Sequence, residues 1–531
     1  MSHPSWAARL TAALFACLAM YLAAFVTPQG DIPDESGHYA YVVDMTKGRP
    51  LPLLGTAEIH PNLWRDVEGV VSSNRKNYIV QHPPLYYGVA AIPYAVLDRF
   101  TDDKRLLPLA PRLISALSLG LLVFTLFAIL REIGVQEGGA IAGASLVGFV
   151  PTVTHLSSGI TNDIFLTLMC ALATLYLVRF LLHERLRDAY VCALWLTLAG
   201  ATKMTAWILI VAFVGILIYE LRRPWKLWLL HAAGLGLLAM ASPLWWMRRN
   251  YYHFKDPFFV YGSHFKAKFP DYSLWDYLTQ VNFVELMMYH FYGFIGFSGY
   301  CQTPDTLERV RSLCQGVRVM RIEGVSYQLF ATLALVCALI LVVVLLIRAF
   351  RQTDPGVVPS PGQASLQSTV SDLLGYPALR TSLTVLLAVL GLVGSVYAMR
   401  VSAKTEWSST LIPLCAAFLV VWAGVIGVAP SLWGRQAADR ILGYGPLLLL
   451  LFTALLFQKG QQSMVLTGMP HGIQGRYLLP FVPLLLASFA VATRSWRHQS
   501  TLFWCLCVAM AWAFVNAYAN VIIPFFQTSR V

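Results

Sequence analysis

Three ionisable residues stand close together in the first polar segment of the chain. Asp34 and Glu35 are adjacent carboxylates, and His38 follows Asp34 by about one helical turn. A carboxylate at such a position can accept the proton of an attacking hydroxyl group, and a histidine can orient it. A solvated loop in which Asp34 caps the following helix explains the same residues without any chemistry. The residues themselves leave both interpretations open.

The same segment continues to a histidine that is followed by two prolines and a pair of tyrosines. His82 precedes the prolines, and Tyr86 and Tyr87 follow them. Prolines in a first helical turn and paired tyrosines are typical of a helix that lies in the membrane interface. The tyrosines then act as aromatic anchors, whereas His82 lies beside the mouth of any cavity and remains a candidate.

Later polar turns supply further acidic and basic groups. Asn162 and Asp163 occupy a short turn, Lys203 lies between two short apolar runs, and Arg476 with Tyr477 follows a turn bounded by glycines. Each of these residues also has a purely structural explanation. Asn162 or Asp163 can cap the following helix, Lys203 can extend to the membrane surface, and Arg476 can anchor its helix at the interface. Arginine also suits phosphate, because its planar fork donates two parallel hydrogen bonds.

The sequence lacks the patterns of several common catalytic sites. It has no Gly-rich nucleotide cradle, no Cys/His metal spacing and no Gly-x-Ser-x-Gly elbow. A reaction served by soluble ATP or by a nucleotide-sugar is therefore not supported. Acidic, basic and aromatic residues remain, and the fold must bring them to one place.

The elements that must position these residues are membrane spans. Of the 531 residues, 57% are hydrophobic and only 12% are charged, and the mean hydropathy is +0.60. Soluble domains have roughly a quarter of their residues charged. Apolar runs of about 20 residues recur along the whole chain, which predicts an all-α polytopic membrane protein. The net charge of +12 lies mainly in short loops, so it indicates membrane orientation rather than nucleic-acid binding.

The apolar runs predict about 13 transmembrane helices. They lie at 8–27, 111–130, 139–157, 162–182, 189–202, 205–221, 226–247, 326–348, 380–399, 408–428, 441–458, 477–493 and 501–523. The segment 83–97 is apolar but only about 15 residues long, so we expect it to lie on the membrane surface. With a cytoplasmic N-terminus, the short cytoplasmic connections then hold most of the basic residues.

The same topology predicts two long extracytoplasmic loops that carry juxtamembrane helices. Residues 1–250 form a seven-span module with the outer loop 28–110, and residues 251–325 form the second outer loop. Residues 326–531 form a six-span region with a cytoplasmic linker at 352–379. In the second outer loop, Cys301 and Cys314 could form one disulfide if that compartment is oxidising.

The order of these motifs resembles the C-type glycosyltransferases, polytopic enzymes that use lipid-linked sugar donors. The shared features are Pro33-Asp34-Glu35 with His38, the run that opens at His82, the start of a span at Arg112-Leu113, and the turns at Thr161-Asn162-Asp163 and Thr202-Lys203. Within that superfamily, the run from Gln474 to Pro480 looks most like an uncharacterised bacterial membrane-protein family of predicted glycosyltransferases. The resemblance implies a bacterial inner or plasma membrane protein with an extracytoplasmic active site.

The resemblance also implies an inverting transfer of a hexose or pentose from a polyprenyl-phosphate donor to a glycan, lipid or protein. Asp34 would be the base that deprotonates the acceptor hydroxyl, with Glu35 as the alternative base. Asp163 would orient the acceptor or the sugar, and Lys203 and Arg476 would hold the phosphate leaving group. The expected substrate site also includes His38, His82, Tyr86, Asn162 and Tyr477.

The resemblance favours a reaction without a metal or another cofactor. Relatives with a lipid monophosphate donor work without a metal, whereas oligosaccharyl transferases use a divalent cation beside clustered acids. The second outer turn has Asn162-Asp163 instead of an Asp-x-Asp arrangement, and a divalent cation is the alternative. The expected partners are the lipid-linked donor, an acceptor of unknown identity and membrane lipids.

Two other functions fit a membrane protein with these residues. A transporter or flippase for a lipid-linked sugar would use the same charged groups but would need no base. The sequence shows no internal repeat, which argues against a transporter built from repeated halves. A polysaccharide polymerase or ligase would depend on basic residues of the outer stretch 248–326, namely Arg248, Arg249, His253 and His264.

Overall fold

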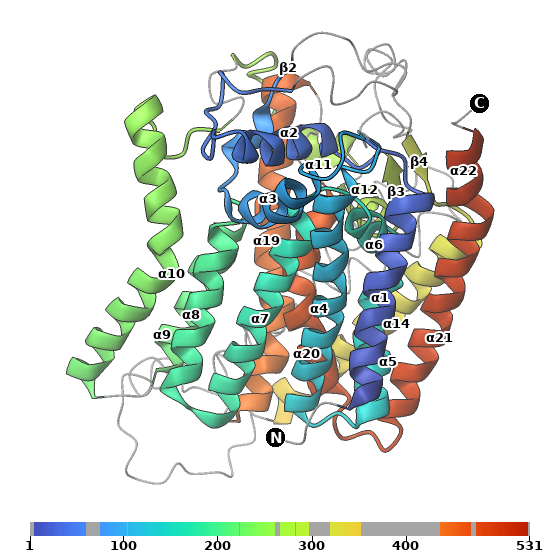
Figure 1. Ribbon diagram of the computed structural model, residues 1–531. Helices are drawn as coiled ribbons and strands as arrows, with labels where there is room; N and C mark the ends of the chain where they lie inside the picture. Colours follow the sequence, from blue (N-terminus) through green and yellow to red (C-terminus); the bar gives the residue numbers. More distant parts are fainter. Residues whose placement is uncertain are drawn as a thin grey trace.

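The computed structural model describes residues 5–59, 75–103, 105–221, 224–260, 266–281, 283–296, 319–351, 436–468 and 474–528. Nearly all of its regular elements are helices, most of which run side by side in one bundle (Figure 1). Two short antiparallel sheets accompany them: β1 (Glu58–Ile59) pairs with β2 (Arg75–Lys76), and β3 (Phe294–Gly296) pairs with β4 (Val319–Arg321). The prediction of an all-α polytopic membrane protein is confirmed.

Eight helices among the described residues are long and apolar enough to cross a membrane. They are α1 (Trp6–Phe25), α4 (Leu109–Ile133), α7 (Asn162–His183), α10 (Trp225–Phe254), α14 (Val325–Arg351), α19 (Ala437–Thr467), η4 with α20 (Gly475–Phe481 and Val482–Ala492), and α21 with η5 and α22 (Gln499–Ala517, Tyr518–Ile522 and Ile523–Thr528). Each coincides with a span that the sequence predicts.

The expected span at 139–157 is not one straight helix. It consists of α5 (Glu137–Gly148) and α6 (Pro151–Ser157), which meet at an angle of 73°. Pro151 has no backbone N–H and disfavours the helical conformation of the residue before it. Val150 is accordingly extended, with φ −83° and ψ 115°. The proline therefore breaks the span and places α6 at its end.

The expected total of 13 spans stays a prediction, because the described residues contain fewer helices that are long enough to cross a membrane. Helices α8 (Leu186–Gly200) and α9 (Ala206–Glu220) have 15 residues each, fewer than the roughly 20 that cross a bilayer without thinning it. The predicted spans and linker between 352 and 428 lie outside the described residues, and so do Cys301 and Cys314.

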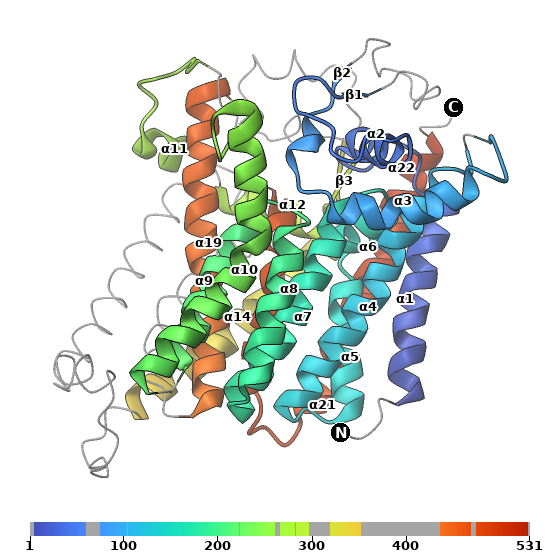
Figure 2. The ribbon, with the colours of Figure 1, turned by 60° about the vertical axis from the view of Figure 1, so that its left-hand side comes forward.

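Helices α2 (Glu35–Thr46) and α3 (Leu85–Leu97) lie across one end of the bundle, which we call the α2–α3 end (Figure 2). The 3-10 helix η2 (Tyr78–Gln81) precedes α3, and α11 (Leu274–Gln280) and α12 (Phe283–Tyr292) lie at the same end. The apolar segment at 83–97 therefore does not cross the bundle, as the sequence predicts. Its start is fixed by hydrogen bonds from Leu85 N–H to Ala201 O (3.0 Å) and from Trp246 Nε1 to Gln81 O (3.2 Å).

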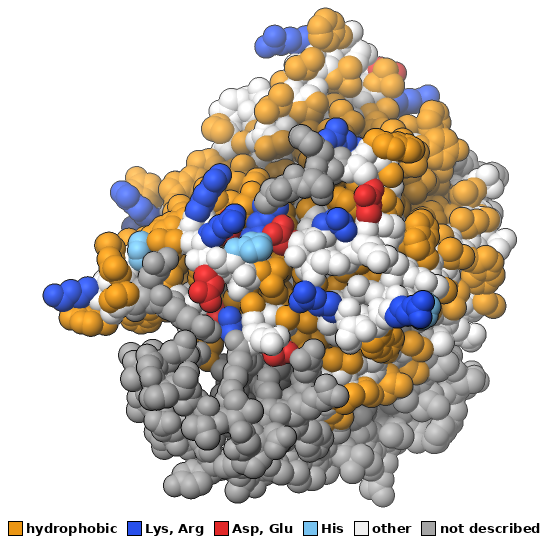
Figure 3. All heavy atoms as spheres, turned by 90° about the horizontal axis from the view of Figure 1, so that it is seen from below, with side chains coloured by type: hydrophobic (Ala, Val, Ile, Leu, Met, Phe, Trp, Pro, Cys, Tyr) orange, Lys and Arg blue, Asp and Glu red, His pale blue; other side chains and the backbone are white. Residues whose placement is uncertain are grey.

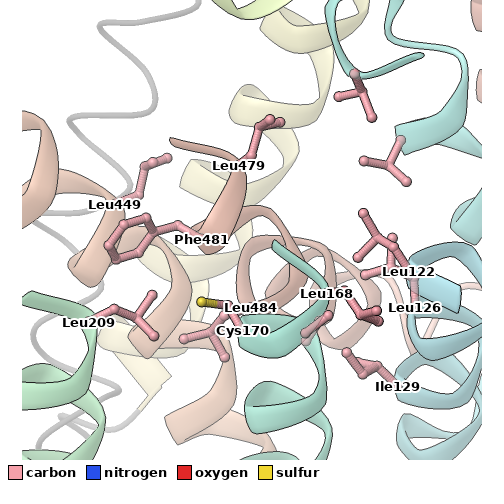
Figure 4. Packing of buried hydrophobic residues seen from close by; sticks show 14 of the residues in the cluster. Leu122, Leu126, Ile129, Leu168, Cys170, Leu209, Leu449, Leu479, Phe481 and Leu484 are labelled. Carbon is pink, nitrogen blue, oxygen red and sulfur yellow. The ribbon is translucent and has the colours of Figure 1, made fainter. Parts of the chain in front are cut away.

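Apolar side chains from distant parts of the sequence fill the centre of the bundle. Figure 4 shows Leu126 of α4, Cys170 of α7 and Leu449 of α19 among them. Lipid tails are as apolar as leucine, so close packing rather than exclusion of water holds such helices together. Gly120 of α4 shows how close the packing is, because a Cβ there would lie 2.6 Å from the carbonyl oxygen of Ala12 in α1.

The end of the bundle opposite α2 and α3 carries exposed basic residues. Figure 3 shows Lys and Arg side chains spread over this face. Exposed basic residues at the helix ends here are Arg131, Arg185, Arg187, Lys226, Arg494 and Arg497. Short connections rich in Lys and Arg are typical of the cytoplasmic side of a membrane protein.

We expect the end opposite α2 and α3 to face the cytoplasm. In a variant without its own cysteines, single cysteines at Lys255 and Asp103 should react with an impermeant maleimide in right-side-out vesicles. Cysteines at Arg187 and Arg497 should react only after the vesicles are opened. A gel-shift assay measures this, and labelling of positions 187 and 255 from the same side would contradict the topology.

Candidate active site

Asp34 is a partly exposed carboxylate at the start of α2, with 28% of its side chain accessible. It occupies the N-cap position but makes no capping hydrogen bond, and its backbone is left-handed at φ 65° and ψ 9°. Aspartate adopts this conformation more readily than most residues other than glycine, because its short side chain forms local hydrogen bonds. The carboxylate instead accepts hydrogen bonds from the Tyr78 hydroxyl and, at 3.1 Å, from Nη2 of Arg476. The backbone therefore directs Asp34 towards these partners and not towards the helix.

Arg476 joins this carboxylate to a second one. It lies in η4, where its side chain is 6% exposed, and its Nη1 lies 3.5 Å from Oδ2 of Asp163. The preceding Gly475 makes this position possible, because a Cβ there would lie 2.2 Å from the carbonyl oxygen of Met287 in α12. The glycine before Arg476 is thus explained by close packing of two backbones. The arginine is a buried bridge and not an anchor at the membrane surface.

Asp163 and Lys203 form a buried ion pair beside this bridge. Oδ1 of Asp163 lies 2.5 Å from Nζ of Lys203, and each side chain is about 5–6% exposed. Thr161 caps α7, because its hydroxyl accepts the N–H of Asp163 at 3.3 Å. The cap leaves the Asp163 carboxylate free to face Lys203. Burial lowers the pKa of the Lys203 amine, and the Asp163 carboxylate opposes that shift.

Glu35 is held in a different way from its neighbour Asp34. Its two oxygens accept hydrogen bonds from Nε and Nη2 of Arg112, each at 2.9 Å, and both side chains are 1% exposed. The same carboxylate accepts the N–H groups of Gly30 (2.8 Å) and Ile160 (2.9 Å). Four donors therefore occupy Glu35, which favours Asp34 as the carboxylate that can meet a substrate.

A neutral polar network lies behind the acids. Nδ1 of His38 lies 2.9 Å from the hydroxyl of Tyr87, which also accepts a hydrogen bond from Nδ2 of Asn162 at 3.2 Å. Burial, with a contribution from Lys203, lowers the pKa of His38 to about 3. His38 is therefore uncharged at neutral pH and serves as a hydrogen-bonding group.

Tyr87, and not the expected Tyr86, belongs to this network. The hydroxyl of Tyr86 lies 3.0 Å from Oγ of Ser115, on the side of α4. The two tyrosines are adjacent in the sequence, and the rotation from one residue to the next in α3 turns them to different partners. Tyr78 is a second residue that the expected site lacks. Burial and the Asp34 carboxylate raise the pKa of Tyr78 well above its usual value, so its hydroxyl stays protonated and donates.

Two buried polar atoms at this place have no hydrogen-bond partner among the described residues. They are Nδ1 of His82 and Oδ1 of Asn162. Burial, and next to it the Lys203 charge, lowers the pKa of His82 well below its usual value, so its ring is neutral too. Buried polar groups are normally paired. These two atoms are therefore suited to the hydroxyl groups of a bound ligand.

The arrangement as a whole brings together residues from both ends of the sequence. The predicted Asp34, His38, Asp163, Lys203 and Arg476 meet at the α2–α3 end, and Tyr477 packs beside the last two. Among the described residues, no three His, Cys, Asp or Glu side chains are grouped so that they could hold a metal ion. The site offers a partly exposed carboxylate, two buried cations and neutral hydrogen-bonding groups.

Arg248, Arg249 and His253, which the sequence places in the outer stretch 248–326, lie in the last turns of α10. Nη2 of Arg249 donates to the carbonyl oxygen of Pro52 at 2.9 Å, and its guanidinium lies 4.3 Å from the ring centre of Trp246. Arg249, which lies in α10, therefore fastens the first outer loop to that helix. His264 lies outside the described residues.

Residues 81–246 match the model of a family described as dolichyl-phosphate-mannose-protein mannosyltransferase. The match covers less than a third of the chain, and it confirms for this segment the resemblance to glycosyltransferases with lipid-linked donors. No curated protein matches the sequence.

Several solved structures are similar to the chain at low identity. The S. cerevisiae protein O-mannosyltransferase Pmt1-Pmt2 complex bound to the sugar donor has 15% identity and a TM-score of 0.34, over 47% of this chain and 34% of that chain. ArnT from Cupriavidus metallidurans has 13% identity and a TM-score of 0.36, over 92% and 76%. The archaeal oligosaccharyltransferase AglB from Archaeoglobus fulgidus has 12% identity and a TM-score of 0.41, over 99% and 56%. The chain thus overlaps about a third of the first of these proteins.

Replacing Glu35 by Gln should destabilise the fold. It leaves the Arg112 guanidinium buried without its counter-charge, which typically costs about 3–5 kcal/mol. The matched control is Glu58→Gln, whose partner Lys76 is 55% exposed and whose loss should cost at most about 1 kcal/mol. Melting temperatures in detergent measure both effects, and equal melting temperatures of the two variants would contradict the structural role of Glu35.

The lowered pKa of His38 predicts a pH dependence of stability. The unfolded chain binds a proton at this histidine near pH 6.5 and the folded chain only near pH 3. Its contribution is therefore complete above pH 6.5 and is lost as the pH falls towards 3. His38→Gln should lose less melting temperature than the wild type between pH 7.5 and 5, whereas the exposed control His253→Gln should follow the wild type. A loss in His38→Gln equal to that of the wild type would contradict the prediction.

Proposed function

We propose that the chain is a membrane glycosyltransferase that moves a sugar from a polyprenyl-phosphate donor to a hydroxyl group of an acceptor at the α2–α3 end. One observation carries the proposal: the accessible carboxylate of Asp34 shares Arg476 with the buried pair of Asp163 and Lys203. A proton acceptor thus lies beside cations that suit a leaving phosphate. The family match over residues 81–246 supports the same class of reaction.

The proposed reaction is a single displacement with inversion. The acceptor oxygen attacks the anomeric carbon from the side opposite the phosphate, and its proton passes to Asp34. The bond between the anomeric carbon and the phosphate oxygen breaks, and its electron pair stays on the phosphate. The products are the glycosylated acceptor and polyprenyl phosphate. Inversion at the anomeric carbon follows from the direction of attack.

The other residues of the site bind and orient in this proposal. Lys203 and Arg476 hold the phosphate, whose negative charge grows as the bond breaks. Asp163 keeps Lys203 charged and in place. His38 and His82 meet hydroxyl groups of the sugar as neutral partners, and they do so with Asn162, Tyr477 and Tyr87. Glu35 has a structural role, because Arg112 and two backbone N–H groups occupy its oxygens.

Arg476 couples the two halves of the reaction. While Asp34 is ionised, it accepts a hydrogen bond from Nη2 of Arg476 at 3.1 Å. When Asp34 takes the proton of the acceptor, its charge disappears and its hold on the guanidinium weakens. The guanidinium can then turn its charge to the phosphate, which gains negative charge in the same step. Base and leaving group are thereby linked through one side chain.

Asp34→Asn is the variant that tests the general base. It keeps the size of the side chain and removes the proton acceptor, so turnover should fall by roughly 10²–10⁴-fold. Binding of polyprenyl phosphate should be at least as tight as in the wild type, because the neutral amide holds the Arg476 guanidinium less strongly. The control is Asp44→Asn, the same change on the same helix, at a carboxylate that pairs with the exposed Arg49. Release of polyprenyl phosphate from labelled donors in the presence of acceptor extracts measures turnover.

Two outcomes would count against the proposal. Wild-type turnover in Asp34→Asn would remove Asp34 from the mechanism. Wild-type protein that moves the intact donor across a liposome membrane without cleaving it would indicate a flippase, which needs no base.

A further inference from the structure

Lys459 is a charged residue of a membrane-spanning helix that has no role in the steps above. It lies in α19, about 33 Å from the start of that helix at 1.5 Å per residue. The hydrocarbon core of a bilayer is about 30 Å thick, so Lys459 lies near its boundary at the α2–α3 end. Its side chain is exposed. The amine of a lysine at such a depth reaches the headgroup region, where the charged groups of lipids lie.

The amine of Lys459 belongs to the same cluster as the two proposed phosphate ligands. Its Nζ lies 5.8 Å from the ring centre of Tyr477. Nζ of Lys203 lies 5.2 Å from that centre, and Cζ of Arg476 lies 5.8 Å from it. Three cations therefore lie within 5.8 Å of the centre of one aromatic ring. The ring attracts them electrostatically but carries no net charge, so their mutual repulsion is not cancelled.

The charges of the described residues at this place do not balance. The carboxylates of Asp34 and Asp163 face Lys203 and Arg476, and Glu35 is balanced by Arg112. No described carboxylate pairs with Lys459. Among the described residues, the cluster thus has one positive charge in excess. Lys459 carries this excess charge, and it is exposed whereas Lys203 and Arg476 are buried.

A phosphodiester that links a lipid to a sugar matches this excess. It carries one negative charge, and its phosphate lies at the level of the headgroups. During transfer, the lipid phosphate gains negative charge, and the acceptor proton neutralises Asp34. The positive excess of the cluster therefore grows in the same step as the negative charge of the phosphate. Lys459 is placed where such a phosphate first reaches the cluster from the membrane.

We propose that Lys459 is a third phosphate ligand, which receives the lipid phosphate at the membrane boundary and holds it with Lys203 and Arg476. This inference rests on the proposed glycosyltransferase function. A charge-assisted hydrogen bond to phosphate is lost when the amine is removed, which predicts roughly 10- to 100-fold weaker binding.

Binding of radiolabelled polyprenyl monophosphate to the full chain in phosphatidylcholine nanodiscs tests the proposal. Lys459→Gln should bind roughly 10- to 100-fold more weakly than the wild type, and Lys459→Arg should stay within a few-fold. The matched control is Lys226→Gln, because Lys226 also lies over an aromatic ring, 5.7 Å from the centre of Trp225, at the start of α10. That control should bind as the wild type does.

Competitors show which phosphate the cluster recognises. An excess of phosphatidic acid or of inorganic phosphate should not displace the labelled lipid. Displacement by phosphatidic acid would show a site for general lipid headgroups and would overturn the proposal, and so would displacement by inorganic phosphate. Lys459→Met serves as the second neutral variant if Lys459→Gln does not fold.

The role of Lys459 and the proposed glycosyltransferase function can fail separately. Unchanged affinity in Lys459→Gln or Lys459→Met would overturn the role of Lys459, while release of lipid phosphate by the wild type would leave the proposed function standing. A wild-type protein that binds no polyprenyl phosphate would overturn both.

Discussion

The buried ion pair of Glu35 and Arg112 is the interaction on which the site depends. Glu35 accepts the N–H groups of Gly30 and Ile160, and Arg112 donates to the carbonyl oxygens of Ala23, Thr27 and Pro28. The pair thus fixes the end of α1, the start of α2, the start of α4 and the turn before α7. A buried pair of this kind adds little net stability, but losing one partner is costly. Its role here is geometric, since it sets where Asp34 and Asp163 lie.

The site itself is completed from the far end of the chain. Arg476 reaches back to Asp34, which precedes it by 442 residues. Gly475 allows this by close contact with the backbone of α12. The N-terminal part alone would hold Asp34, Asp163 and Lys203 with an excess of negative charge. Arg476 neutralises that excess. Lys459 on the neighbouring α19 then makes the net charge positive, which favours binding of an anion.

Parts of this arrangement could be predicted from the sequence for clear physical reasons. Spans about 20 residues long and the bias of basic residues in short loops placed Asp34, Asp163, Lys203 and Arg476 at one end of the bundle. The shortness of the segment around α3 kept it out of the span count. Other features depend on contacts between distant residues. The partner of Glu35 lies 77 residues away, so the sequence offered two adjacent carboxylates without separating their roles.

Helix rotation and helix ends account for other differences. Tyr86 and Tyr87 are neighbours in the sequence, but only Tyr87 turns towards His38. The span predicted at 441–458 stops just before Lys459, whereas α19 continues to Thr467 and keeps the lysine on the helix. The break at Pro151 had a signal in the sequence, since a proline inside an apolar run disfavours a straight helix.

Phosphorus NMR of a lipid-linked donor tests the central claim most directly. Wild-type protein in nanodiscs is supplied with a panel of polyprenyl-phosphate sugars and with acceptor extracts, and the ³¹P spectrum is followed over time. The account predicts that the phosphodiester resonance of the true donor is replaced by the resonance of a phosphomonoester, at a rate proportional to the concentration of the wild-type protein. A phosphodiester resonance that persists for every donor would contradict the claim that this chain breaks the bond between sugar and phosphate.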